Sequence, residues 1–286
     1  MDSQTVPDVT RPPRRAGRPQ TTLEVVRREQ LSPHLVRLTF GGPAFDAFVP
    51  KFATDQYVKV YFAKPELGLT RPYDLESLRE TLAPDDLPVT RTYTVRSFDL
   101  AAKTLAIEFV VHGDDGIAGP WAASAQPGDL LTFSGPGGNY APDPTAGWHL
   151  FAGDQSALPA IAAALGALPA DAIGLAFLEV GDSADVFELD APAGVTLNWL
   201  FSGGTEPGTS TALRDAIAGS VWPQSRPHIF AHGERGAMKS LRDHFRERGV
   251  TRDQLSLSGY WAAGRAEDRF QAEKREPIGQ IDPVSD

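Results

Sequence analysis

The chain has 286 residues, enough for two domains of ordinary size, and its 41% hydrophobic and 22% charged residues are a typical globular composition. A formal net charge of −10 argues against a nucleic-acid-binding protein, and the lack of cysteine excludes disulfides, thiol nucleophiles and cysteine-bound zinc, haem or iron–sulfur clusters. No apolar run approaches the roughly 18 residues that a membrane span needs, so we expect a cytoplasmic protein.

The first half has the pattern of short β-strands. Residues 1–20 carry arginines and prolines without an apolar stretch, and we expect a disordered arm rather than a signal peptide. From residue 21 to residue 140, β-branched or alternating runs are separated by turn residues, which predicts an antiparallel barrel or sandwich. The proline-rich segment 64–89 is expected to be a long loop with one short helix at 74–82. The predicted strands are 21–30, 34–40, 55–62, 90–98 and 103–113.

The second half alternates apolar runs with helical patterns. After a linker at 141–146, residues 147–262 have the order that is typical of a doubly wound parallel α/β sheet. Residues 263–286 form a C-terminal extension, in which the charged run 267–276 is expected to be the solvated face of a helix, with Lys274 and Arg275 as candidates for an anion pocket. The predicted strands are 148–153, 172–181, 195–204, 227–234 and 255–261, and the predicted helices are 157–168, 210–219 and 236–249.

Each apolar run of the second half ends in glycine with a polar residue beside it. In an open α/β sheet the ligand crevice lies outside the carboxyl ends of the strands, and glycine there lets a ligand approach the backbone. Five such endings favour a nucleotide site over simple chain turns. Asp154, after the first strand, could bond ribose hydroxyls or cap the following helix. The endings are Gly153-Asp154, Gly181-Asp182, Ser202-Gly203-Gly204, Gly233-Glu234 and Gly259-Tyr260.

The familiar nucleotide and hydrolase motifs are absent. The chain has no G-x-G-x-x-G, P-loop, G-x-S-x-G or H-E-x-x-H, so a dinucleotide must be held in another way. Segment 113–125 runs from glycines and aspartates into a helical pattern; it could bind phosphate at the helix start or simply cap the helix, with His112 beside it. Loop 135–140, GPGGNY, could be a second phosphate-approach loop or an interdomain turn.

The run RTYTVRSFD at 91–99 is unusual for a strand. Alternation places Arg91, Tyr93 and Val95 on one face and the two threonines with Arg96 on the other. Cations and an aromatic ring next to hydroxyls make a poor dry core. They suit a ligand with an anionic tail, a flat aromatic head and hydrogen-bonding edges.

The order of these motifs resembles that of the siderophore-interacting proteins, the FAD-dependent ferric-siderophore reductases of the ferredoxin–NADP reductase superfamily. R-T-Y-T-V-R is followed by H-G-D-D-G-I-A-G-P-W-A and then by A-G-D-x-x-A-L-P-A-I, and the likeness extends from residue 21 to residue 277. It implies an antiparallel six-stranded β-barrel that binds FAD at 21–140 and a doubly wound α/β domain that binds NAD(P)H at 147–262.

The resemblance also implies roles for single residues. Arg91 would neutralise the flavin phosphates, Tyr93 would pack on the isoalloxazine or ribityl group, and Thr94 would bond near the flavin N5. The other residues expected at FAD are Val110, His112, Gly113, Ala118, Gly119, Trp121 and Ala122. Those expected at NAD(P)H are Asp154, Ser156, Gly233 and Glu234.

Two positions depart from the family's pattern. Gln155 stands where the family often has glutamate, which puts a ribose contact in doubt. Phe201-Ser202 stand where the family often has a His-Arg pair, so a phosphate-binding cation is missing and NADH is favoured over NADPH.

The implied reaction passes a hydride from NAD(P)H to the flavin and then single electrons to a ferric siderophore, from which Fe(II) leaves for iron assimilation. No side chain needs to act as acid or base, no resident metal is expected, and we expect a monomer, with a ferredoxin as a second candidate donor. A cationic rim would attract anionic ferric siderophores, although each candidate could be a solvated surface charge; they are Lys51, Lys59, Arg96 and Lys274. The alternatives are another flavin-dependent ferric or ferredoxin-type reductase and a non-catalytic siderophore- or flavin-binding module.

Overall fold

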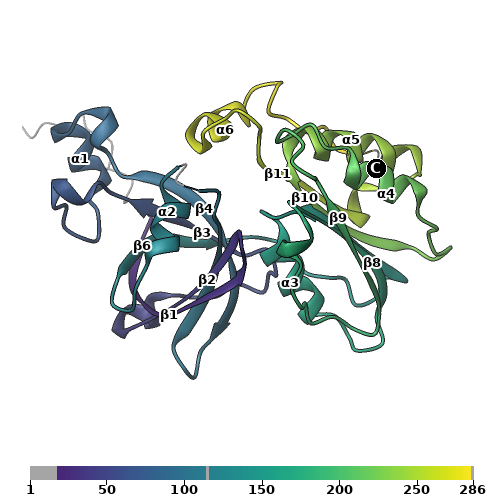
Figure 1. Cartoon of the computed structure of the whole chain (residues 1–286), viewed down its shortest axis with the longest axis horizontal. Helices are drawn as coiled ribbons and strands as arrows, with labels where there is room; N and C mark the ends of the chain where they lie inside the picture. Colours follow the sequence, from purple (N-terminus) through teal and green to yellow (C-terminus); the bar gives the residue numbers. More distant parts are fainter. Residues whose placement is uncertain (1–17, 114–115, 285–286) are drawn as a thin grey trace, which may run out of the picture.

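The computed structural model describes residues 18–113 and 116–284, and it consists of a β-barrel and an α/β sheet that lie side by side (Figure 1). The expected disordered arm at 1–20 lies outside the described residues except for its last three positions, and so do Asp114 and Asp115 of the predicted phosphate loop. Among the described residues, no helix is long and apolar enough to cross a membrane.

The barrel is closed, antiparallel and six-stranded, in the order β1-β2-β5-β4-β3-β6, which confirms the expected architecture. Alternation explains its wall: in β3, Val58, Val60 and Phe62 are buried in the barrel core, while Tyr57, Lys59 and Tyr61 are only partly buried. The strands are β1 (Gln20–Ser32), β2 (Leu35–Gly41), β3 (Tyr57–Phe62), β4 (Val89–Asp99), β5 (Thr104–Val110) and β6 (Leu130–Gly137).

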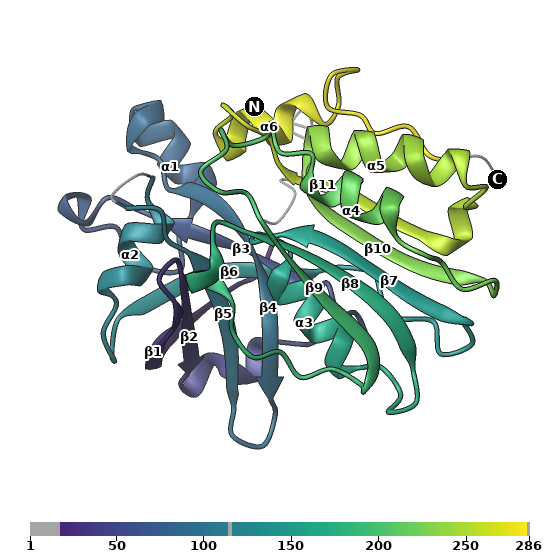
Figure 2. The ribbon, with the colours of Figure 1, turned by 45° about the vertical axis from the view of Figure 1, so that its right-hand side comes forward.

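Two short helices belong to the barrel half. Helix α1 (Leu75–Thr81) lies in the long β3–β4 connection, where Asp74 caps it by accepting from the Ser77 N–H. Helix α2 (Ala118–Ser124) packs against β2 and β5 (Figure 2). Ala118 and Ala122 are buried in the barrel core, and Trp121 packs beside them.

The second half is a five-stranded parallel sheet in the order β11-β10-β7-β8-β9, which confirms the doubly wound prediction. Both faces are covered: Phe151 of β7 packs with α3, whereas Leu150 and Ala152 pack with α4 and α5. The strands are β7 (Trp148–Asp154), β8 (Ile173–Val180), β9 (Gly194–Phe201), β10 (Pro227–Glu234) and β11 (Leu255–Trp261). The helices are α3 (Leu158–Gly166), α4 (Ala212–Gly219) and α5 (Arg235–Glu247).

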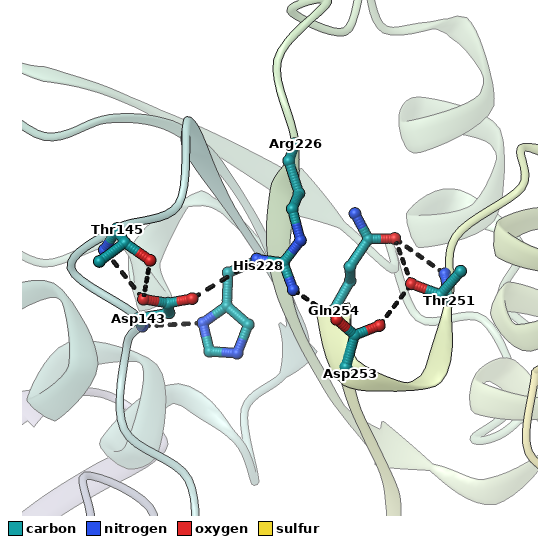
Figure 3. Close-up of polar contacts among 7 residues, drawn as sticks. All are labelled: Asp143, Thr145, Arg226, His228, Thr251, Asp253 and Gln254. Carbon is teal, nitrogen blue, oxygen red and sulfur yellow. Dashed lines mark hydrogen bonds and ion pairs between the residues drawn. The ribbon is translucent and has the colours of Figure 1, made fainter. Parts of the chain in front are cut away.

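A polar network at the amino ends of these strands holds the linker (Figure 3). Arg226 reaches the carboxylates of Asp143 in the linker and Asp253 before β11, at 3.4 Å and 2.6 Å. The backbone N–H of Asp143 donates to Nδ1 of His228 at 2.9 Å, and the His228 ring stacks on Tyr140. The linker is therefore tied to the start of β10.

The C-terminal extension contains helix α6 (Glu267–Glu273), which leaves the sheet after β11 and approaches β4 of the barrel (Figure 1). Most of the charged run is solvated, as expected; its exposed charged residues are Asp268, Arg269, Lys274, Arg275 and Glu276. Two residues of α6 depart from that expectation. Phe270 is 2% exposed, and Glu273 is 5% exposed with its carboxylate among three arginines.

Candidate active site

A cavity of about 370 Å³ lies where the barrel, the carboxyl edge of the sheet and α6 meet. Its volume is within the range of small-molecule sites in proteins. Residues from both halves of the chain line it. They are Asp55, Tyr57, Lys59, Arg91, Thr92, Tyr93, Thr94, Glu108 and Val110 from the barrel, Gln155, Ser156, Pro159, Ser258, Tyr260 and Trp261 from the α/β half, and Glu267, Gln271 and Lys274 from the C-terminal extension.

Strand β4 contributes four consecutive residues, 91–94, because one of its edges is open there. Within the described residues, this stretch pairs only with β3, and pairing with β5 begins at Val95. An open strand edge offers backbone N–H groups to a ligand or to another segment. The Thr92 N–H donates to the Glu267 carboxylate at 3.1 Å rather than to a neighbouring strand.

The alternation predicted for β4 holds from Thr92 to Val95, whereas Arg91 also reaches α6 and the register shifts between Val95 and Ser97. Val95 is buried in the barrel core, and Tyr93 packs against the core residue Phe109 with ring centroids 4.4 Å apart. Thr92 and Thr94 point away from that core, toward α6 and Tyr260 respectively.

Two partly buried tyrosines present neutral aromatic rings to the cavity. Burial raises the pKa of Tyr93 well above its usual range, and the negative charge of Glu267 adds to this. Burial likewise raises the pKa of Tyr260, aided by Asp55 and opposed by a hydrogen bond with Thr94. Both hydroxyls therefore stay protonated at any physiological pH.

Three cations surround the same space. The Arg91 guanidinium is 3.9 Å from the Asp268 carboxylate, and the Lys59 ammonium is 3.4 Å from that of Glu267. Burial lowers the pKa of Lys274, and the positive charge of Lys59 adds to this. An anionic ligand would relieve the mutual repulsion of these groups.

The comparisons with known proteins agree with this geometry. The siderophore-interacting FAD-binding domain family matches residues 24–140, and the siderophore-interacting protein family matches residues 146–264. The chain belongs to the siderophore-interacting protein family.

Relatives match over nearly the whole chain. An uncharacterized protein of Mycobacterium tuberculosis is 46% identical over 91% of this chain and 96% of its own length. The ferric vibriobactin reductase ViuB of Vibrio cholerae is 33% identical over 88% of this chain and 93% of its own. The crystal structure of a siderophore utilization protein from T. fusca superposes with a TM-score of 0.76 at 38% identity, covering 87% of this chain and 94% of that one. A Plasmodium falciparum ferredoxin–NADP+ reductase, at 12% identity and a TM-score of 0.59 over 84% of this chain and 96% of that one, shares the fold.

The residues that resemblance to this siderophore-interacting family assigns to FAD fall into two groups. Arg91, Tyr93, Thr94 and Val110 line the cavity together. The others lie beyond its described lining, around α2 and the end of β5: His112, Gly113, Ala118, Gly119, Trp121 and Ala122.

Close packing explains most of this second group. A Cβ on Gly119 would lie 3.2 Å from the Val110 carbonyl oxygen, so glycine lets α2 approach β5. The alanines and Trp121 pack with the barrel core. Burial lowers the pKa of His112, whose ring lies 6.2 Å from that of His34, and His34 contacts the Asp185 carboxylate of the α/β domain at 3.0 Å.

The residues assigned to NAD(P)H lie at the switch point between β7 and β10, where connections leave for opposite faces of the sheet. The buried Asp154 carboxylate accepts from Ser156 N–H at 2.9 Å, Glu234 N–H at 2.7 Å and Trp261 Nε1 at 2.8 Å. Gly233 is required here, because a Cβ would lie 2.7 Å from Asp154 Oδ2. Asp154 thus joins three strand ends, and Ser156 alone of the four reaches the cavity lining.

Two of the four candidate siderophore cations, Lys59 and Lys274, line the cavity. Lys51 is exposed on the loop before β3. Arg96 turns instead toward the buried Glu108 carboxylate, 3.6 Å from its Nε, and burial lowers the pKa of Arg96.

Several lining residues were not among the predicted site residues. Tyr260 and Trp261 follow Gly259 at the end of β11, and the sequence pattern indicated Tyr260 only as part of the Gly259-Tyr260 strand ending. Asp55 lies in the turn before β3 and accepts from the N–H groups of Asn139 and Tyr140, both at 2.9 Å, which ties the GPGGNY loop to the cavity wall. No local pattern indicated Glu267 or Gln271.

The lining fits FAD. Arg91 and Lys59 suit a diphosphate, and the rings of Tyr93 and Tyr260 suit a flat aromatic system. The Thr94 hydroxyl suits a polar ring edge.

Proposed function

We propose that this protein is an FAD-dependent reductase that takes electrons from NAD(P)H and passes them to ferric siderophores in the cytoplasm. One observation carries the proposal: the flavin-type residues of β4 and the strand ends of the nucleotide-type sheet line the same cavity. A cofactor held by β4 would therefore lie next to a dinucleotide held at the sheet edge. The match to a FAD-binding domain family and the name of the V. cholerae relative support the same reading.

On the barrel side, Arg91 and Lys59 would bind the FAD diphosphate, and the open edge at Thr92 would add a backbone N–H. Tyr93 would pack against the flavin, and Thr94 would donate to its polar edge. Bound FAD supplies the needed chemistry, since it accepts a hydride and releases electrons singly. The protein's own residues bind, orient and exclude water, and the neutral tyrosines add no charge next to the ring.

On the other side, Ser156 and the strand ends organised by Asp154 would receive NAD(P)H. The preference for NADH stays a prediction; Phe201, on which it partly rests, is about half exposed at the end of β9. Lys59 and Lys274 would attract the anionic ferric siderophore, because a cationic rim raises the local concentration of an anionic substrate.

An anaerobic titration tests the proposal. The purified protein should show the absorbance bands of oxidised flavin, and NADH or NADPH should bleach them. Adding ferric siderophores should restore the bands and produce Fe(II), detected with a ferrous chelator. A folded protein that binds no FAD would contradict the proposal. Bleaching by reduced ferredoxin alone, or turnover with protein acceptors only, would favour another ferredoxin-type reductase. FAD binding without reduction by any donor would favour a binding module.

A further inference from the structure

Helix α6 is fixed at one end to the α/β domain. The Glu273 carboxylate accepts from Arg235 at 2.8 Å, Arg265 at 2.7 Å and Arg269 at 3.0 Å, and these arginines lower the pKa of Glu273 to about 2. Phe270, one turn earlier, is buried beneath the Arg235 guanidinium. Because Arg235 begins α5, this end of α6 is anchored to the sheet's own helix layer.

The other end of α6 reaches across the cavity to the barrel. The Glu267 carboxylate accepts from the backbone N–H of Thr92 at 3.1 Å, from the Thr92 hydroxyl and from the Lys59 ammonium at 3.4 Å. Asp268 lies 3.9 Å from the Arg91 guanidinium. The helix is therefore a strap between the two halves of the molecule.

The barrel groups that the strap contacts are the anion-binding groups of β3 and β4. A carboxylate and a phosphate use the same donors, namely a backbone N–H, a hydroxyl, an ammonium and a guanidinium. Resting on the proposed function, we propose that Glu267 is an internal competitor of the FAD diphosphate, so that α6 is a displaceable strap over the cofactor site.

The geometry lets the strap release without unfolding its anchor. Gly264 lies between β11 and α6 with φ of +69°, so a flexible residue precedes the first turn of α6. Displacement requires the Glu267 end to move, which can break the nearby Arg265 contact while Arg235 and Arg269 still hold Glu273 near the site. A competing conformation lowers the apparent affinity of a ligand by the fraction of molecules that occupy it.

The test is a titration of the full-length, cofactor-free protein with FAD, in which the quenching of flavin fluorescence measures binding. Glu267→Gln keeps the size of the side chain and removes its charge. We expect this variant to bind FAD about five- to tenfold more tightly than the wild type, which corresponds to a wild type whose site is free of Glu267 in about 10–20% of molecules. The matched control is Glu276→Gln, an exposed carboxylate of the same extension, which should leave FAD affinity unchanged.

Riboflavin, which lacks the diphosphate, separates this role from a change in cavity shape. Glu267→Gln should leave riboflavin binding unchanged, and an equal gain for riboflavin and FAD would overturn the inference. Unchanged or weaker FAD binding by a Glu267→Gln variant that unfolds at the wild-type temperature would also overturn the inference. The proposed function would still stand in that case, provided that the wild-type protein itself binds FAD. Asp268→Asn, next to Arg91, should give a smaller gain in the same direction. A wild type that binds no FAD would overturn both proposals.

Discussion

Similar charged residues lie in different surroundings at the two ends of the parallel strands, which we call the amino edge and the carboxyl edge of the sheet. At the amino edge, Arg226 lies between the carboxylates of Asp143 and Asp253 and ties the linker to the sheet (Figure 3). At the carboxyl edge, Arg91 and Lys59 of the barrel meet the carboxylates of α6. Both are networks of opposite charge.

What distinguishes the carboxyl edge is the space around its charges. There the cations line a cavity together with two tyrosines and the stretch of β4 that has one open edge. At the amino edge the partners of Arg226 lie on the surface, and solvent weakens such pairs. A charge cluster alone therefore does not identify a site, whereas a cluster beside a cavity and an open strand edge does.

Of the variants that test this comparison, Arg91→Ala should have the largest effect, which is a loss of FAD affinity. Losing a charge-assisted contact to the diphosphate costs about 1.5–3 kcal/mol, so FAD affinity should fall by about ten- to a hundredfold. Flavin content after purification and a fluorescence titration would measure it.

Arg226→Ala is the control for that variant, because it removes the same charge from the opposite edge. Its FAD affinity should equal that of the wild type. Retention of full flavin content by Arg91→Ala would remove Arg91 from the cofactor site.

Local patterns were sufficient to predict the fold. Alternation in segments such as β3 and the glycine-ended apolar runs are properties of a few neighbouring residues, so an antiparallel barrel or sandwich and a parallel sheet could both be predicted, and the resemblance chose the barrel. The strand β6 was the exception: the sequence patterns located five barrel strands, and the count of six came from family resemblance.

The site was predictable only in part. Arg91, Tyr93 and Thr94 stood out because their strand is unsuitable for a core. Glu267 could not be found in this way, since its contact with Thr92 depends on the path of the chain between β11 and α6. The burial of Glu273 likewise depends on Arg235, which is 38 residues away in the sequence.

The histidines at the two edges should contribute differently to the pH dependence of the protein's stability. Burial lowers the pKa of His232, in β10 near the carboxyl edge, to about 3, whereas an unfolded histidine titrates near 6.5. Below pH 6.5 the unfolded state then binds more protons than the folded state. The free energy of unfolding is therefore highest above pH 6.5 and falls as the pH drops toward 3. Between pH 6.5 and pH 5 this amounts to about 2 kcal/mol.

Urea unfolding at several pH values would measure this slope. His232→Gln, which keeps a hydrogen-bonding group for Ser256, should reduce the slope by about one proton. At the amino edge burial also lowers the pKa of His228, but the Asp143 charge opposes it, so His228→Gln should change the slope less. Equal slopes in the wild type and His232→Gln would show that His232 is not protonated on unfolding in this range.

The smallest expected effect is the stability change in Arg226→Ala. Exposed ion pairs contribute little because water and salt screen them, so the melting temperature should fall by about 2 °C at most. Because screening weakens the pairs in the wild type, the difference between the two proteins should shrink at high salt. Differential scanning fluorimetry at low and high sodium chloride would measure it. A larger, salt-independent decrease would mean that Arg226 stabilises the linker by packing against its neighbours, and the amino edge would then resemble the anchored end of α6 more than a solvated charge cluster.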